Sequence, residues 1–254
     1  MIEARPYYSA GSLSAAFYDL ITGVDASLAG DIDLYAGLAA PGATVLELGA
    51  GSGRIAQGLA ERGLSVTGVD IAPAMLAKAR TRLAALPPQV AARIELRQDD
   101  LTCARLGRTF DLVICPFFTL AHIPLAAWTS AFATAVAHLA GGALAAFHLP
   151  RLELMRGAPR LDPVRPVMDL PLSGDRRLRL YVKARDFRPA EGALSQVVEY
   201  VVSDRTGRII ERSPERLTYF MADPQPPAAA AGLALDRPPI PLSRVGDVWV
   251  FRPS

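Results

Sequence analysis

The stretch Val45-Leu46-Glu47-Leu48-Gly49-Ala50-Gly51-Ser52-Gly53-Arg54 decides the fold, because it joins an apolar strand to a helix through a glycine-rich turn. Glycines at this spacing let the backbone turn tightly and pass close to a ligand. The first turn of the helix offers free N–H groups. A second predicted strand, residues 65–69, ends just before Asp70. A carboxylate there accepts hydrogen bonds from both hydroxyls of a ribose, so the pattern predicts a pocket for a nucleoside cofactor.

The spacing of the glycines and the acid before them indicate which cofactor the pocket holds. A dinucleotide fingerprint has its third glycine three residues after Gly51, where this chain has Arg54. Glu47, which precedes the glycines, would repel a pyrophosphate. The same carboxylate suits a cofactor that carries an amino-acid tail and a sulfonium. The pattern therefore favours S-adenosylmethionine over a nicotinamide dinucleotide.

Composition excludes several classes of protein. The chain has 254 residues and a net charge of +2, and its basic residues are scattered, so we expect no nucleic-acid partner. The cysteines, Cys103 and Cys115, have neither the number for a disulfide framework nor the spacing of zinc ligands. We expect a cytoplasmic protein without a metal site.

One apolar segment, residues 131–149, is long enough to suggest a membrane span. Gly141 and Gly142 divide it, and His138 and His148 lie within it. A buried helix, a glycine turn and a core strand explain the segment better, so we expect no membrane partner.

The order of elements predicts a doubly wound, Rossmann-like α/β sheet with mostly parallel strands and a C-terminal antiparallel β meander. We divide the chain into a cofactor-binding α/β domain with N-terminal helices (1–150), an antiparallel insert over the active site (151–222) and a return to the core sheet (223–254). The predicted core strands are 44–48, 65–69, 93–98, 110–115, 143–149 and 245–251, and those of the insert are 179–187, 195–203 and 209–219. The predicted helices are 12–22, 30–39, 52–62, 73–83 and 126–139, with a loop or short helix over 223–231.

Three segments carry a resemblance to a known family. They are the glycine-rich stretch with Glu47, the run Val66-Thr67-Gly68-Val69-Asp70-Ile71-Ala72-Pro73-Ala74-Met75-Leu76, and the pair Asp99-Asp100. In this order they resemble motifs of the class I S-adenosylmethionine-dependent methyltransferases. Residues 16–19, 115–122, 215–220 and 249–253 resemble landmarks of a bacterial small-molecule subgroup of that family with an antiparallel insert.

The resemblance implies a set of cofactor contacts. Glu47, Gly49, Ala50, Gly51 and Gly53 would contact the methionyl end. Apart from the resemblance, Tyr18 on the N-terminal segment is a candidate donor to the methionyl carboxylate, with helix packing as the alternative. Asp70 would bind the ribose with few structural duties of its own, Ile71 and Met75 would flank the adenine, and Asp99 or Asp100 would address its amino group. Leu101 and Pro116 complete the expected cofactor-binding set.

The acceptor side is less constrained. Methyl transfer is an in-line displacement that requires alignment and exclusion of water, and a base only if the acceptor must lose a proton. His122, just past the fourth core strand, is the candidate base; capping of the next helix is the alternative. Tyr7, Phe117, Phe118 and His148 are candidate substrate contacts, with core packing as the alternative for His148. Relatives often have a polar residue in place of Phe118, which predicts a more apolar acceptor pocket here.

The predicted function is methylation of a small, partly apolar or aromatic metabolite at nitrogen, oxygen or carbon. Two alternatives stay open: an NAD(P)-dependent oxidoreductase, and a non-catalytic cofactor-binding partner protein. The oligomeric state, monomer or homodimer, is open as well.

Overall fold

The computed structural model describes residues 3–153 and 161–254 and contains two sheets. The larger one has eight strands in the order β11-β13-β6-β5-β2-β3-β4, with β12 paired to β13. Its strands are β2 (Thr44–Leu48), β3 (Ser65–Asp70), β4 (Ile94–Gln98), β5 (Phe110–Cys115), β6 (Leu139–Pro150), β11 (Leu233–Leu235), β12 (Ile240–Pro241) and β13 (Gly246–Pro253). Strands β2 to β6 pair in parallel and β13 is antiparallel to β6, which confirms the predicted doubly wound α/β class.

The order of strands reverses between β2 and β5. From β2 the chain adds β3 and β4 on one side, and then β5 and β6 on the other. At such a switch point the connections that leave the two central strands diverge, and a crevice opens at their carboxyl ends. The glycine-rich turn after β2 and residues 116–122 after β5 are these connections. The topology therefore positions a ligand site at this edge of the sheet.

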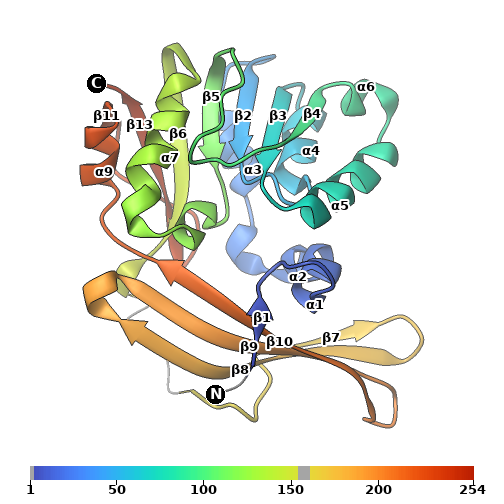
Figure 1. The fold of residues 1–254 in the computed structure, drawn as a ribbon. Helices are drawn as coiled ribbons and strands as arrows, with labels where there is room; N and C mark the ends of the chain where they lie inside the picture. The colour runs from blue at the N-terminus through green and yellow to red at the C-terminus, as the bar shows by residue number, and fades with distance from the viewer. Residues whose placement is uncertain (1–2, 154–160) are drawn as a thin grey trace.

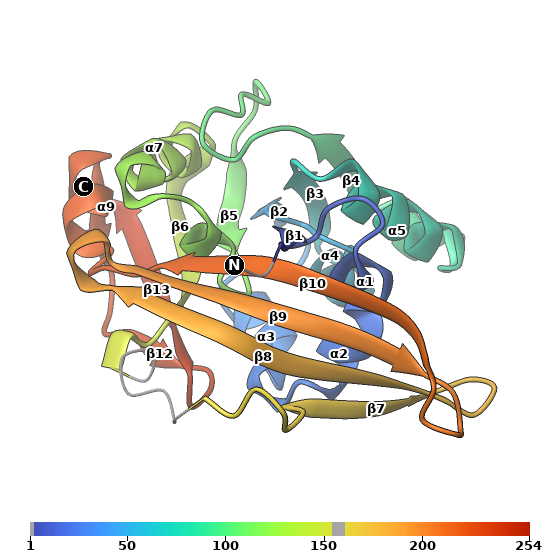
Figure 2. The same ribbon diagram turned by 60° about the horizontal axis from the view of Figure 1, so that its bottom comes forward.

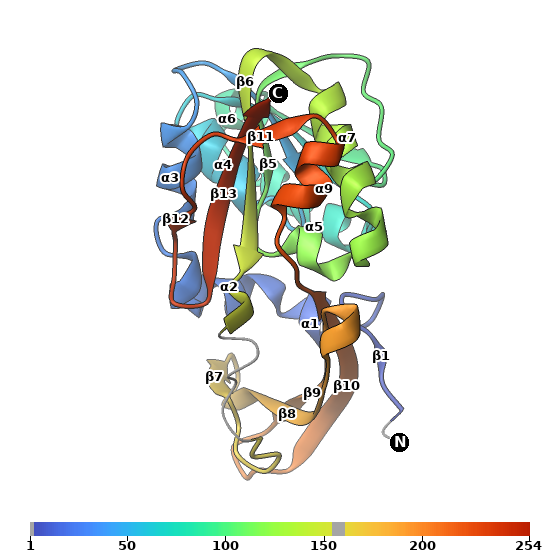
Figure 3. The ribbon, with the colours of Figure 1, turned by 90° about the vertical axis from the view of Figure 1, so that its left-hand side faces the viewer.

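Helices bury both faces of the central sheet (Figure 3). On one face, Tyr35 of α3 and Leu59 of α4 are fully buried against β2. On the other face, Phe132 of α7 packs against Phe147 of β6, with 4.6 Å between ring centroids. The helices of this domain are α3 (Asp31–Gly37), α4 (Arg54–Glu61), α5 (Pro73–Ala84), α6 (Pro88–Ala91), α7 (Trp128–Ala137) and α9 (Gln225–Ala230).

The smaller sheet has five strands and lies across the carboxyl edge of the core sheet (Figures 1 and 2). Its order is β1-β10-β9-β8-β7, antiparallel except that β1 runs parallel to β10. One face carries Leu178, Val198 and Tyr200, which pack with Leu13 in a separate core. The strands are β1 (Arg5–Pro6), β7 (Met168–Leu172), β8 (Arg176–Arg188), β9 (Ala193–Ser203) and β10 (Ile209–Phe220), and the helices beside them are α1 (Leu13–Ala16) and α2 (Tyr18–Val24).

Several elements differ from the prediction. The single helix expected over 12–22 is two helices, because Phe17 leaves the helical region at φ −102° and ψ 14°. Strands β1 and β7 escaped sequence reasoning, since β1 is only two residues long and β7 contains Pro171. Strand β6 begins at Leu139 rather than 143, and Gly142 lies where its register against β5 shifts. Within residues 3–153 and 161–254, no helix has the length and hydrophobicity needed to cross a bilayer.

Candidate functional site

A cavity of about 630 Å³ occupies the crevice at the switch point. The turns after β2, β3 and β5 line it, together with the N-terminal segment, α2 and β10. It brings together most of the predicted site residues: Tyr7, Tyr18, Glu47, Gly49, Ala50, Gly51, Asp70, Ile71, Met75, Asp99, Asp100, Leu101, Pro116, Phe117 and His122.

The glycine-rich turn packs directly against the connection that follows β5. Gly49 has φ +83°, and a Cβ there would lie 2.3 Å from Cγ2 of Thr119. The amides of Gly49 and Ala50 both donate to the carbonyl of Val69, at 2.8 and 2.9 Å. Any side chain at position 49 would therefore force the two walls of the crevice apart.

Asp70 closes the same turn, contrary to the expectation that it has few structural duties. Its Oδ2 accepts the amide of Gly51 at 2.7 Å and its Oδ1 accepts the amide of Ala72 at 2.8 Å. Burial raises the pKa of the carboxyl group, and these two hydrogen bonds oppose the increase. Each carboxylate oxygen has a further lone pair. Asp70 can therefore support the turn and still face a ribose.

Glu47 presents a buried carboxylate to the cavity. Its side chain is 1% exposed, and Oε2 has no hydrogen-bond partner in the described part of the chain. Burial raises the pKa of Glu47 well above its usual range, and the charge of Arg54 opposes this. Arg54 is itself held by Asp31, with Nη1 donating to Oδ1 at 3.0 Å and Nη2 to Oδ2. An orphaned acidic oxygen beside a glycine turn fits the ammonium group of a ligand.

Two apolar side chains and two acids line a further part of the cavity. Ile71 is 65% exposed although it is apolar, while Met75 is buried. Asp100 Oδ1 accepts both the amide and the hydroxyl of Thr102 at 2.8 Å, and Asp99 Oδ1 accepts the amide of Asp100 at 2.8 Å. Each acid thus has one oxygen engaged in the turn. An exposed apolar side chain beside acceptor oxygens suits a purine.

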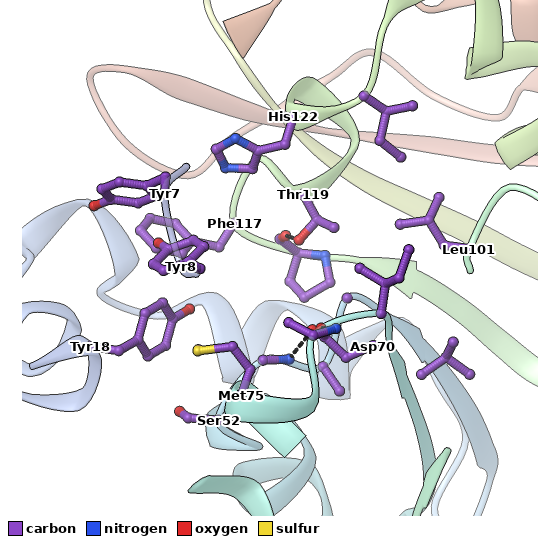
Figure 4. A pocket seen from close by; sticks show the side chains of 18 of the residues that line it. Tyr7, Tyr8, Tyr18, Ser52, Asp70, Met75, Leu101, Phe117, Thr119 and His122 are labelled. Carbon is purple, nitrogen blue, oxygen red and sulfur yellow. Dashed lines mark hydrogen bonds between the residues drawn. The ribbon is translucent and has the colours of Figure 1, made fainter. Parts of the chain in front are cut away.

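Aromatic rings form the opposite wall (Figure 4). Tyr8 stands between Tyr7 and Tyr18, with centroid separations of 4.2 and 5.4 Å. The Tyr7 hydroxyl is hydrogen-bonded to that of Tyr200 at 2.7 Å. Tyr8 and Phe117 both have positive φ, at 57° and 47°. Such conformations are uncommon for bulky residues and mark sites where tertiary packing imposes the backbone.

Two carboxylates, the half-buried Asp19 and the fully buried Glu215, fasten the N-terminal segment that carries these tyrosines. Asp19 of α2 accepts a hydrogen bond from Oγ of Ser52 at 2.5 Å and from Nη2 of Arg82 at 2.6 Å, which ties α2 to the glycine-rich turn and to α5. Glu215 of β10 accepts the amide of Ser14 at 3.2 Å. The segment is thus anchored to the core and to the insert at once.

His122 lies at the junction of the core and the insert. It is the last residue of the 3-10 helix η2 (Thr119–His122), and its ring stacks on Tyr219 at 4.9 Å between centroids. Burial lowers the pKa of His122 to about 4, and a hydrogen bond to the backbone of Thr218 opposes this. Because that bond uses one ring nitrogen as a donor to a carbonyl, the other nitrogen of the neutral ring is a hydrogen-bond acceptor.

Three predicted contacts lie behind the cavity rather than in its lining. Phe118 is 8% exposed and stacks on His148, which is fully buried. Phe118 packs inward on His148, whereas Phe117, whose backbone is also left-handed, lines the cavity. The acceptor pocket therefore gains no apolar character from Phe118. Gly53, third of the motif, faces α5, where a Cβ would lie 3.3 Å from that of Ala79.

The cavity also includes residues to which sequence reasoning gave no role. Among them are Tyr8, Ser52, Thr119, Arg216, Leu217 and Thr218. All but Tyr8 and Ser52 lie in residues 115–122 and 215–220, two segments that carry the family resemblance. No spacing in the sequence predicts that the residues after β5 meet those of β10. Only the docking of the insert brings them together.

Comparisons with known proteins place this geometry in context. Residues 45–142 match a family described as "Methyltransferase domain". A ubiquinone biosynthesis O-methyltransferase from Pseudomonas paraeruginosa is 40% identical over 93 residues, which are 37% of this chain and 38% of that protein. One from Xanthomonas campestris pv. campestris is 36% identical over 87 residues, 34% of this chain and 35% of that protein. The matched region thus spans well under half of either relative.

Solved structures resemble nearly the whole chain. The CcbJ methyltransferase from Streptomyces caelestis has a TM-score of 0.75 at 23% identity and covers 98% of both chains. An amino pentose methyltransferase from Micromonospora echinaspora has a TM-score of 0.68 at 22% identity, covering 94% of this chain and 97% of its own. At these identities the likeness concerns the fold, and it includes the antiparallel insert.

Proposed function

We propose that this chain, whose residues 45–142 match a methyltransferase domain, is a class I S-adenosylmethionine-dependent methyltransferase that transfers the methyl group to an amine nitrogen of a small molecule. One observation carries the proposal. A single cavity is lined both by Glu47, whose Oε2 has no hydrogen-bond partner among the described residues, and by the neutral imidazole of His122.

The carboxylates of the cavity support the cofactor. Glu47 is matched to the methionyl ammonium, Asp70 to the ribose, and Ile71 and Met75 to the faces of the adenine. Oε2 of Glu47 has no hydrogen-bond partner among the described residues, and a pyrophosphate brings it no N–H to accept, whereas the methionyl ammonium does; the geometry therefore disfavours a dinucleotide. S-adenosylmethionine supplies a methyl group on a sulfonium, which leaves as the thioether S-adenosylhomocysteine.

The chemistry of His122 supports nitrogen as the acceptor atom. An imidazole whose pKa is about 4 is a weak base, and a hydroxyl or phenol must lose a much more tightly held proton to become a strong nucleophile. A neutral amine attacks with its own lone pair and releases a proton only afterwards. The free nitrogen of His122 needs only to accept a hydrogen bond from the amine N–H and so orient that lone pair.

The names of several structural neighbours agree with this choice. The amino pentose methyltransferase described above and a sugar N-methyltransferase from Streptoalloteichus (TM-score 0.64) both act on nitrogen-bearing sugars by their descriptions. The aromatic wall formed by Tyr7, Tyr8, Tyr18 and Phe117 offers ring faces for such an acceptor or for an aromatic amine. We infer a cytoplasmic enzyme, a monomer or homodimer, that acts without nucleic acid.

Two measurements test the proposal. Calorimetry should give binding of S-adenosylmethionine and S-adenosylhomocysteine near micromolar affinity, about −8 kcal/mol, and no binding of NADH. Transfer from methyl-labelled cofactor is then compared between matched probes, benzylamine with benzyl alcohol and glucosamine with glucose. Label in the amines alone supports nitrogen transfer; label in the alcohols alone contradicts it. NADH binding without binding of either sulfur ligand would overturn the whole proposal.

A further inference from the structure

The turn after β5 holds two consecutive bulky residues in a conformation that such residues rarely adopt. Phe117 has φ +47° and Phe118 has φ +59°. Both values lie in the left-handed region, which crowds the Cβ of an L-residue. This turn directs Phe117 into the cavity and begins the η2 helix that ends at His122. Both acceptor-side contacts therefore depend on what stabilises the turn.

A buried layer behind the cavity wall provides that stabilisation. The Phe118 amide donates to the His148 carbonyl at 3.2 Å, and the two rings stack at 4.4 Å between centroids. Gly246 of β13 lies directly against both rings. A Cβ on it would lie 2.4 Å from Cε1 of Phe118 and 2.6 Å from Nε2 of His148. Its backbone is not left-handed, so glycine is required for space.

The same layer reaches His122 through a second ring. Phe118 meets Tyr219 edge-on, at 6.3 Å and an interplanar angle of 89°. Tyr219 stacks on His122 at 4.9 Å and 33°. Aromatic interiors pack densely and transmit displacements, so a shift of Phe118 moves Tyr219 and with it the imidazole.

His148 contributes to this layer through the stacking of its ring on Phe118. It is fully buried, and neither ring nitrogen has a hydrogen-bond partner among the described residues. A hydrogen-bonding role within the described chain is therefore absent, while the stacking contact with Phe118 is close. An aromatic hydrocarbon of similar shape should perform the same task.

We propose that the layer formed by Phe118, His148 and Gly246 positions Phe117 and His122 against the acceptor, so that these three buried residues control turnover without touching either ligand. The part of the inference that concerns turnover rests on the proposed function, because turnover here means methyl transfer to the acceptor. Its structural part concerns the placement of the His122 ring and can be measured without any acceptor.

Gly246→Ala is the direct test, with Gly141→Ala as the matched control. Gly141 lies in β6, the strand paired to β13, and a Cβ there meets nothing within 4 Å. In Gly246→Ala we expect the affinity for S-adenosylhomocysteine to stay within about threefold and kcat to fall about 10- to 100-fold, because a misplacement of about 1 Å has effects of that size. KM for the acceptor should change less than kcat. Gly141→Ala should match the parent in all three.

Proton NMR of the imidazoles tests the placement itself. The chain has three histidines, so the Hε1 signals can be assigned by single substitutions. The His122 signal, shifted by the Tyr219 ring, should move in Gly246→Ala and stay in Gly141→Ala. A folded Gly246→Ala protein with the parental His122 signal and parental kcat overturns the proposal. If no acceptor is methylated by the parent, the proposed function fails, and the NMR shift still decides the positioning claim.

A second pair of variants decides the question if Gly246→Ala does not fold. His148→Phe keeps the flat ring and should retain kcat within about threefold, whereas His148→Ala should lose about 10-fold or more at unchanged cofactor affinity. Equal kcat in the two variants, or rescue by neither, contradicts a positioning layer built on ring stacking.

Discussion

Replacing Asp70 with Ala should destabilise the protein even when no cofactor is bound. The substitution leaves the amides of Gly51 and Ala72 without the acceptors that they reach at 2.7 and 2.8 Å. A hydrogen bond to a charged group contributes about 1.5–3 kcal/mol, and part of this is offset here by the burial that raises the pKa of Asp70. We therefore expect a loss of about 2–4 kcal/mol in the free energy of unfolding.

Thermal unfolding of the cofactor-free protein measures this loss. For a chain of this size, 1 kcal/mol corresponds to about 2–4 °C in Tm, so Asp70→Ala should lower Tm by roughly 5–15 °C. Asp70→Asn keeps one acceptor oxygen and should lose about half as much, because acceptor oxygens rather than charge support the turn. Calorimetry should also show a weaker affinity for S-adenosylhomocysteine by about 1.5–3 kcal/mol in Asp70→Ala.

Asp111 provides a matched control at the other end of the sheet. It also accepts a backbone amide and a second donor, both from Thr44 at 2.8 Å, but it is exposed. Asp111→Ala should cost about 1 kcal/mol or less and leave cofactor affinity unchanged. A Tm of cofactor-free Asp70→Ala within about 2 °C of the parent would refute the role of Asp70 in the turn. Parental cofactor affinity would refute its role at the ribose.

The remaining predictions concern the other ionisable groups of the site. His122→Ala should lower kcat about 100-fold at unchanged cofactor affinity, which is at the low end of the effect of a positioned acid–base group. A loss below threefold in steady-state assays would exclude His122 as the group that orients the acceptor amine. Because the pKa of His122 is held at about 4, the parental rate should rise with pH through the pKa of the amine acceptor and show no step near 6.5. Glu47→Gln should weaken cofactor binding about 10- to 100-fold in calorimetry. The cofactor-free Tm should stay equal or rise, since an ionisable group whose charged form is penalised by burial is replaced by an uncharged amide; a lower Tm with unchanged affinity would contradict this. Burial also lowers the pKa of His148 to about 4, so below about pH 6.5 the unfolded chain takes up a proton that the folded chain excludes. The free energy of unfolding should therefore fall as the pH drops from 6.5 towards 4, by up to about 1.4 kcal/mol per pH unit. In urea unfolding at a series of pH values, the free energy of unfolding of His148→Phe should depend less steeply on pH.

The cofactor half of the site was open to prediction because local rules define it. The alternation of buried strands with helices, the positive φ of Gly49 and Gly51, and an acid at the end of β3 each follow from short-range geometry. Once parallel strands are placed, their carboxyl ends meet at one edge, so Glu47 and Asp70 must lie in the same crevice. The sequence determined the fold class and the kind of cofactor.

Only the tertiary structure decided the acceptor half. Whether Phe117 or Phe118 faces the cavity depends on a left-handed turn that Gly246, far along the chain, makes room for. His148 lies behind the wall for the same reason, and Thr218 meets His122 only because the insert docks across the sheet. These contacts join segments with no sequence spacing in common, and packing rather than backbone propensity selects among them. Local patterns carry information about φ and periodicity, but the side of a wall that a ring occupies is set by what packs behind it.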